Sequence, residues 1–283
     1  METISEIMAL RAALQDARRG GKTIGLVPTM GAFHEGHLSL MRRAKADSDI
    51  CVVTLFVNPT QFNDREDFAR YPRDTARDAR MAEVEGVDYL FAPTPEAMYP
   101  KGFDTVVTVP ALSGRLEGAA RPGHFAGVAT VVAKLLNLAQ ADRACFGEKD
   151  WQQLQVIKAL TRDLDIPTEI VGLPIIRESD GLALSSRNVR LTGEERSAAL
   201  VISRALDGVQ ALVGTGVQDA AKLADGMRRM IEAEPLARLD YAVVVAPDTL
   251  QEVETVAGGA IALIAATFGK VRLIDNRMLG MSI

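Results

Sequence analysis

Several features that would restrict the function of a protein are scarce in this 283-residue sequence. Basic residues are not in excess. The formal net charge is −5, which disfavours extended nucleic-acid binding because such binding needs a basic face. No run approaches the ~18 apolar residues of a membrane-spanning helix. The acidic start, Met1–Glu6, lacks the basic region of a signal peptide. We therefore expect no nucleic-acid or membrane partner.

Cysteine is also scarce. The two cysteines, Cys51 and Cys145, each lie in an apolar, strand-like run. They form no CxxC motif and have no histidine cluster nearby, so they do not predict a zinc site. Buried thiols in a reducing compartment are the favoured interpretation, and a disulfide is the alternative. This usage predicts a cytoplasmic protein.

The stretch that organises the chain is 23–37, with the sequence TIGLVPTMGAFHEGH. Its apolar run 24–27 has the length of a buried strand, and Pro28 and Gly31 then turn the chain. A helical pattern follows, with apolar residues three positions apart from Leu38 onward. His34 and His37 thus lie at a helix entrance, where unpaired N–H groups and the helix dipole suit phosphate.

A doubly wound parallel sheet is predicted for the first part of the chain. The run 50–57 is apolar throughout, as in a central parallel strand covered on both faces. Asn58 and Gln61 follow it at the edge where open α/β sheets bind ligands. Strand and helix patterns then alternate as far as residue 175. Further strands are expected over 87–91, 105–109, 144–146 and 169–172, and helices over 74–85, 128–139 and 151–164. Thr3 and Glu6 fit a capping box before the first helix.

The pattern changes after Arg187. Two long helical segments, 193–213 and 217–232, precede strand-like runs over 241–245, 261–267 and 271–274. Helices followed by a hairpin predict a smaller C-terminal α+β domain. The fold class is thus α/β, a Rossmann-like domain over residues 1–176 followed by an α+β lid domain over 177–283.

Three motifs carry chemistry, and each has a plain structural alternative. His34 and His37 could bind phosphate or stabilise the turn. A metal pair is disfavoured because zinc-binding helices use HExxH spacing and no third ligand is evident. Gly147-Glu148-Lys149-Asp150 follows a strand and could hold phosphate and ribose, or form a surface turn. Leu184-Ser185-Ser186-Arg187-Asn188 offers hydroxyl and guanidinium donors for a triphosphate, or is an ordinary loop.

Taken together, these motifs resemble those of the pantoate–β-alanine ligase family. The resemblance lies in PTMGAFHEGH, FVNPTQF, RPGHFAGVATVV, FGEKDWQQ and ESDGLALSSRN, in this order over most of the first 190 residues. HEGH corresponds to the HIGH signature of the nucleotidyltransferase superfamily, and LSSRN stands where the related KMSKS loop stands. Leu184 replaces the methionine usual in the family, a change that conserves volume.

The resemblance implies an ATP-dependent condensation of pantoate with β-alanine through pantoyl adenylate, with release of pyrophosphate and AMP. The residues that it implies for catalysis are His34, His37 and Lys149. For ATP binding it implies Met30, Gly31, His34, His37, Gly147, Glu148, Lys149, Asp150, Ile176, Leu184, Ser185, Ser186 and Arg187. For pantoate and β-alanine it implies Gln61, Gln153, Asn58, Val131 and Val132, although the valines could equally be core residues.

The resemblance also implies Mg²⁺ bound through the ATP phosphates, with no protein metal site, and a homodimer. Two alternatives remain open at this point. One is a nucleotidyltransferase of the same superfamily that acts on another small acid or phosphate. The other is a non-catalytic ATP-binding regulator built on the same fold.

Overall fold

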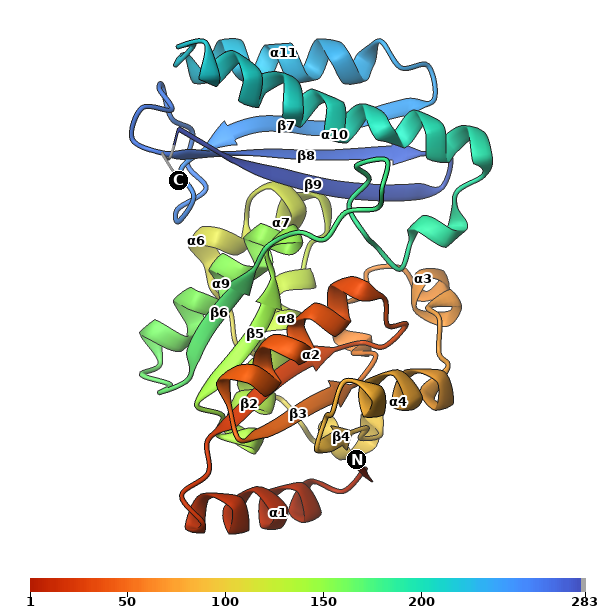
Figure 1. Cartoon of the computed structure of the whole chain (residues 1–283), viewed down its shortest axis with the longest axis vertical. Coiled ribbons are helices and arrows are strands. Elements are labelled where there is room, and N and C mark those ends of the chain that lie inside the picture. Colours follow the sequence, from red (N-terminus) through yellow and green to blue (C-terminus); the bar gives the residue numbers. More distant parts are fainter. Residues whose placement is uncertain (281–283) are drawn as a thin grey trace. The chain divides into compact units, whose positions relative to one another are not determined.

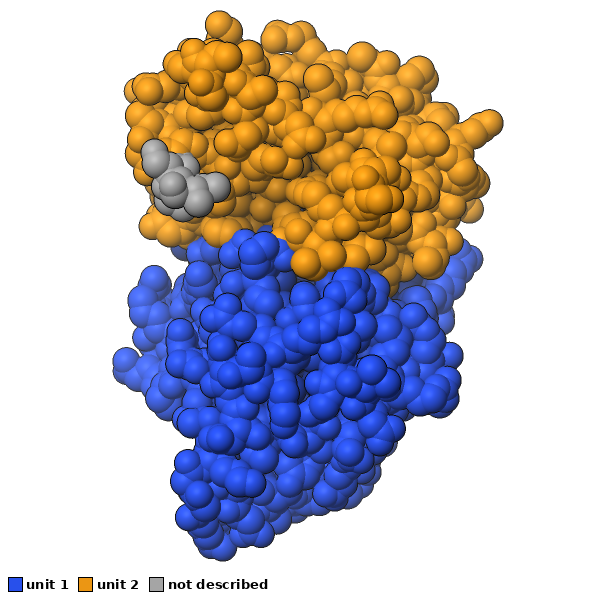
Figure 2. All heavy atoms as spheres, viewed as in Figure 1, with its two compact units in different colours: residues 1–148, 152–174 blue, residues 149–151, 175–283 orange. Residues whose placement is uncertain are grey.

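The computed structural model describes residues 1–280, with Arg65 described by its backbone alone. Contacts within the chain divide it into two compact units (Figure 2). Unit 1 comprises residues 1–148 and 152–174, and unit 2 comprises residues 149–151 and 175–283. Unit 2 therefore includes a three-residue segment, 149–151, that is separated in the sequence from the rest of the unit by residues 152–174 of unit 1.

Unit 1 is built on six strands that all pair in parallel (Figure 1). The spatial order is β1-β4-β3-β2-β5-β6. The strands are β1 (Glu2–Ile4), β2 (Ile24–Thr29), β3 (Ile50–Leu55), β4 (Tyr89–Phe91), β5 (Arg143–Gly147) and β6 (Glu169–Leu173). The apolar side chains of the central strands β2, β3 and β5 are buried on both faces, as expected of a parallel sheet between helices.

Helices cover both faces of this sheet. The helices of the first 174 residues are α1 (Ile7–Arg19), α2 (Glu35–Asp47), α3 (Arg65–Arg70), α4 (Thr75–Val84), α5 (Pro95–Met98), α6 (Pro110–Ser113), α7 (Leu116–Ala120), α8 (His124–Ala139) and α9 (Trp151–Asp163). Helix α2 packs on β2, β3 and β5, and its Leu40 and Met41 share a core with Val27 and Val53. Helix α8 packs on β2 and α1 and lies outside that core.

The strand order places a topological switch point between β2 and β5. From β2 the chain continues through β3 and β4 on one side, and then returns to add β5 on the other side. Loops that leave the carboxyl ends of neighbouring strands at such a point diverge and leave a crevice for a ligand. Residues 30–37, which carry His34 and His37 and are called the histidine loop below, follow β2. Gly147 ends β5.

Unit 2 is an antiparallel sheet covered by two helices (Figure 1). Its strands β7 (Ala237–Val245), β8 (Ala260–Phe268) and β9 (Val271–Leu279) lie in that order and pack against α10 (Gly193–Gly214) and α11 (Ala220–Glu232). Small side chains on β8, such as Ala262 and Ala266, belong to the core that the helices share. Within residues 1–280, α10 is the one helix long and apolar enough by composition to cross a membrane, and its buried side chains belong to this core.

The fold class and most of the expected elements are confirmed. Two expectations are wrong. Residues 105–109 form no strand. Val106 is 66% exposed, so the alternating apolar residues of this segment do not pack on a sheet. Thr3 does not cap the first helix, because it lies in β1 opposite Leu90. The N-cap is Glu6, which makes no side-chain capping bond.

Candidate active site

The histidine loop of unit 1 is held by a buried carboxylate. Gly31 and Ala32 both have positive φ, at 86° and 54°, which is strained for alanine. The Asp78 carboxylate on α4 accepts hydrogen bonds from the backbone N–H of Ala32 at 2.7 Å and of Phe33 at 2.9 Å. A Cβ on Gly31 would lie 2.9 Å from Asp78 Oδ2, so glycine is required there. Asp78 thus fixes the backbone that leads to the histidines.

The two histidines of this loop face one another at the start of α2. His34 is the N-cap residue and His37 is the third residue of the helix. Their ring centroids lie 4.2 Å apart, and both side chains are half-buried. The His34 backbone N–H donates to His37 Nδ1 at 3.3 Å, so the neutral His37 ring carries its proton on Nε2. This tautomer makes Nε2 a donor.

Beyond β3, Asn58 holds Gln61 in place. The Asn58 amide donates to Gln61 Oε1 at 3.0 Å and to the Gly127 carbonyl at 3.1 Å. Its oxygen accepts from the Tyr99 hydroxyl at 2.7 Å and from Thr60 Oγ1 at 2.9 Å. Burial raises the pKa of the Tyr99 phenol, so it remains a donor. Both Asn58 donors are therefore engaged within the protein, and its amide orients Gln61.

The amide of Gln61 points toward the histidine loop. Gln61 Nε2 lies 3.1 Å from Met30 Sδ, a weak acceptor that a carboxylate could replace. The backbone carbonyl of Gln61 accepts from Nδ1 of the buried His124, whose Nε2 accepts in turn from Arg121. The sequence singled out neither His124 nor Asp78, although the position of His124 in the RPGH motif could have drawn attention to it.

A small cavity opens beside this loop in unit 1. Its volume is about 200 Å³. The residues that line it are Met30, Gly31, Leu55, Phe56, Val57, Phe68, Pro72, Arg73, Asp74, Thr75, Asp78, Pro93 and Pro95. The Met30–Gly31 turn is therefore accessible to a small ligand on one side.

The turn after β5 divides between the units. A Cβ on Gly147 would meet no described protein atom within 4 Å, so the space beside it is open. The Glu148 side chain lies over Gly172 in unit 1. Lys149 is half-buried and Asp150 is exposed, and both belong to unit 2.

The two glutamines that follow this turn on α9 differ sharply. Gln152 is 4% exposed, and its amide bonds the backbone of Glu117, Leu112 and Arg115. Gln152 is thus structural, and the predicted Gln153 is half-buried.

The hydroxyl-guanidinium loop of unit 2 follows a small hairpin. Leu184 N–H donates to the Ile176 carbonyl at 2.9 Å, and Arg177 pairs with Ala183. Beyond the loop, the Asn188 amide donates to Glu178 Oε1 and to the Ala183 carbonyl. The loop 184–187 is therefore tied at both ends, and its four residues are half-buried.

The structure distributes the predicted site residues between the two units. Within unit 1, hydrogen bonds and ring contacts join Met30 with Gln61 and Asn58, and His34 with His37. Val131 and Val132 are buried on α8, as core residues are. The predicted residues in unit 2 are Lys149, Asp150, Ile176, Leu184, Ser185, Ser186 and Arg187. Within the described residues, no three or more His, Cys, Asp or Glu side chains are grouped to hold a metal ion.

An open parallel sheet with a donor-rich loop and a glycine turn at its switch point is the construction of a nucleotide-binding α/β protein. Comparison with known proteins narrows this class. The family model described as pantoate-beta-alanine ligase matches residues 2–278. A curated relative, pantothenate synthetase of Heliobacterium modesticaldum, is 53% identical over 276 residues, which cover 98% of each chain.

Solved structures agree with this assignment. Pantothenate synthetase from Thermus thermophilus matches with a TM-score of 0.93 and 47% identity, over 98% of this chain and 99% of the other. Pantoate-beta-alanine ligase from Francisella tularensis, complexed with beta-gamma ATP and beta-alanine, matches with a TM-score of 0.81 and 34% identity, over 100% of this chain and 99% of the other. The chain belongs to the pantoate–β-alanine ligase family, and its activity is the ATP-dependent ligation of pantoate to β-alanine.

Proposed function

We propose that the histidine loop, the turn 147–150 and the loop 184–187 act on one ATP molecule during this ligation. The observation that carries the proposal is the strand order. The histidine loop and Gly147 leave neighbouring strands, β2 and β5, at the switch point of unit 1. Unit 2 supplies Lys149 and Ser185-Ser186-Arg187, which are donors suited to phosphate oxygens.

In the first step, a pantoate carboxylate oxygen attacks the α-phosphorus of ATP, and the bond to the leaving pyrophosphate breaks. His37 Nε2–H and His34 stabilise charge on the phosphate oxygens. To act as proton donor to the leaving pyrophosphate, His37 must be in its imidazolium form, in which Nδ1 carries a proton and no longer accepts from the His34 N–H. Lys149 adds a positive charge, which favours the approach of one anion to another. Glu148 and Asp150 are proposed to hold the nucleotide with Ile176 near the adenine, and Leu184 covers the phosphates with the serine-arginine residues.

In the second step, the β-alanine amine attacks the acyl carbon of pantoyl adenylate, and AMP leaves. Gln61 is proposed to bind the pantoate carboxylate or hydroxyls through its amide, exchanging the weak contact with Met30 Sδ for a stronger one. Gln153 binds the same substrate. Asn58 acts through Gln61, because both of its donors are engaged. Val131 and Val132 line the apolar side of pantoate.

Mg²⁺ would be held by the ATP phosphates. The described residues offer no cluster of carboxylates for a protein-only site, and Mg²⁺ commonly binds through substrate phosphates with few protein ligands. When bound, it neutralises phosphate charge. We further propose that unit 2 closes as a lid over the nucleotide, and that the protein is a cytoplasmic homodimer.

The decisive experiment is pantoate-dependent exchange of pyrophosphate into ATP. We expect exchange without β-alanine, and AMP formation only when pantoate and β-alanine are both present. Exchange that ignores pantoate would indicate a nucleotidyltransferase for another acid. The lack of any exchange, with ATP still bound, would indicate a regulator.

A further inference from the structure

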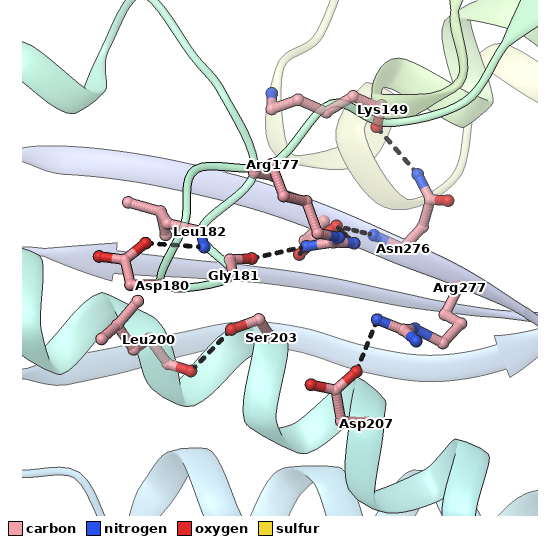
Figure 3. Close-up of polar contacts among 12 residues, drawn as sticks. Lys149, Arg177, Asp180, Gly181, Leu182, Leu200, Ser203, Asp207, Asn276 and Arg277 are labelled. Carbon is pink, nitrogen blue, oxygen red and sulfur yellow. Dashed lines mark hydrogen bonds and ion pairs between the residues drawn. The ribbon is translucent and has the colours of Figure 1, made fainter.

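Two hydrogen bonds from the rest of unit 2 hold the segment 149–151, which includes Lys149. The Asn276 amide on β9 donates to the Lys149 carbonyl at 3.0 Å (Figure 3). Two residues later, the Trp151 indole N–H donates to the Pro247 carbonyl at 2.7 Å. Asn276 is only 5% exposed, and its hydrogen bond to Lys149 is partly buried. The backbone of Lys149 is thus fixed by a side chain distant in sequence.

The neighbouring residue on β9 holds the hairpin before the loop 184–187. Arg177 Nη1 and Nη2 donate to the two Asp275 oxygens at 2.6 and 2.8 Å. Arg177 Nη1 also donates to the Gly181 carbonyl at the hairpin turn (Figure 3). Burial alone would lower the pKa of the Arg177 guanidinium. The hydrogen bonds to Asp275 and the charge of its carboxylate outweigh this effect, so the pKa is raised and the group stays charged. Asp275 is 4% exposed, and a carboxylate so buried requires such a partner.

The two contacts are made on opposite faces of one strand. In a regular strand, adjacent side chains point to opposite sides. Asp275 shares its parity with Leu273 and Leu279, which belong to the core beneath α10, whereas Asn276 has the other parity. The Asn276 backbone N–H also donates to Asp275 Oδ1 at 2.8 Å, which orients that carboxylate. One dipeptide therefore joins two segments whose contacted residues, Lys149 and Arg177, are 28 residues apart in the sequence.

We propose that Asp275 and Asn276 are positioning residues for adenylation, which set Lys149 and the loop 184–187 in register with each other on β9. The proposal rests on the proposed role of these two segments in ATP binding. Neither residue needs to touch ATP. A purely structural role would lower the thermal stability and both chemical steps alike. A positioning role lowers adenylation and raises KM for ATP, while the β-alanine step keeps its rate.

The first test is a double-mutant cycle between Asn276→Ala and Lys149→Ala. We expect Asn276→Ala alone to slow pantoate-dependent ATP–pyrophosphate exchange ~3- to 10-fold, the effect of one hydrogen bond. In the Lys149→Ala background the same change should have almost no further effect, because the backbone carbonyl remains but the ammonium that it positions is gone. If Asn276→Ala does not fold, Asn276→Asp keeps the volume and removes the N–H donor.

The cycle separates the two possible failures. If Lys149→Ala leaves the exchange unchanged, the role of Lys149 in the proposed function is wrong. If Lys149→Ala slows the exchange but Asn276→Ala has no effect, or an equal effect in both backgrounds, the positioning proposal is overturned. Equal slowing of exchange and of the β-alanine step from preformed pantoyl adenylate would overturn it as well.

The second test concerns Asp275. Asp275→Asn removes the charge that fixes Arg177 and should raise KM for ATP ~10-fold or more, because charged hydrogen bonds are stronger than neutral ones. Arg177→Lys keeps the positive charge but cannot make the bidentate contact with Asp275. Its KM for ATP should therefore lie between those of the wild type and Asp275→Asn. The matched control is Arg277→Gln, which breaks the neighbouring ion pair with Asp207 (Figure 3). An equal rise in KM for the control would mean that any damage to β9 suffices, and would overturn the proposal.

Discussion

Unit 1 presents its candidate residues from loops at the ends of parallel strands, whereas unit 2 presents its own from a hairpin and a three-residue segment fixed to an edge strand. In unit 1 the supports are local to the sheet edge, such as Asp78 under the histidine loop. In unit 2 they are single side chains of β9, far away in sequence. Parallel sheets provide a ready edge for ligands. An antiparallel sheet has no such edge, so the candidate residues of unit 2 are held in place by hydrogen bonds from side chains of β9.

The largest effect should come from unit 1. We expect His37→Ala to lower pantoate-dependent exchange ~10²–10³-fold, comparable to the loss of one oxyanion donor. Thermal unfolding should change little, because His37 is half-buried. The control is Glu35→Gln in the same motif, whose exposed carboxylate pairs with Arg42. A His37→Ala enzyme within about threefold of the wild type would remove His37 from the mechanism.

A smaller effect is expected from the cation of unit 2. Lys149→Ala should slow adenylation ~10- to 100-fold, as for the loss of a charged hydrogen bond. The β-alanine step should be spared, since no triphosphate remains. Single-turnover assays from ATP and from preformed pantoyl adenylate separate the two steps. Lys222→Ala, at an exposed position of α11, controls for the loss of one positive charge. Equal slowing of both steps would contradict the assignment.

Alanine substitutions at one helical glycine in each unit test how tightly the helices pack. A Cβ on Gly127 in α8 would lie 2.5 Å from the Thr60 carbonyl oxygen and 2.8 Å from Gln61 N, so Gly127→Ala should destabilise by about 1–3 kcal/mol. A Cβ on Gly226 in α11 would meet no described atom within 4 Å. Gly226→Ala should therefore stabilise by up to about 1 kcal/mol. Thermal melts check both signs. A shift in the same direction for both variants would refute the comparison.

The smallest effect concerns the thiols, which lie only in unit 1. Burial raises the pKa of Cys51 to about 12 and that of Cys145 to about 11, from an ordinary value of 9.0. The protonated thiols stabilise the folded state fully below pH 9, and this contribution is lost as pH rises toward 12. Iodoacetamide should label neither thiol at pH 8, and labelling should begin as unit 1 opens.

The single tryptophan, Trp151, bonds the Pro247 carbonyl in unit 2, so its fluorescence reports the opening of that unit. In denaturant titrations we expect different midpoints for Trp151 emission and for thiol labelling, because each unit has its own core. Identical midpoints at all pH values would show that the units open together.

Sequence patterns were sufficient for the parallel sheet because its strongest signals are local. The apolar run 50–57 and the Pro28–Gly31 break need no distant partner to be recognised. The residues 105–109 have an equally clear alternation but no neighbouring strand, and alternation alone cannot reveal that. The motifs indicated the family and the candidate residues for the same reason, since they are contiguous.

The supports of the candidate site could not be predicted because they are long-range. Asp78 resembles any acid on a charged helix until its bonds to the histidine loop are seen. Gln152 and Gln153 are adjacent and chemically identical, and only packing distinguishes the structural one from the half-buried one. The association of Lys149 with unit 2 depends on Asn276, more than 100 residues later, and no spacing rule connects the two.

The split make-up of unit 2 limits how such chains can be recombined. A chimera that joined unit 1 to a relative's residues from 175 onward would still carry the native Lys149–Trp151 segment inside the first part. That segment would need an amide donor opposite the Lys149 carbonyl and a carbonyl opposite the indole, so the two parents must match at these positions. A single crossover point therefore does not cut this protein into independent modules, and domain exchange among its relatives is constrained by three residues in the middle of the chain.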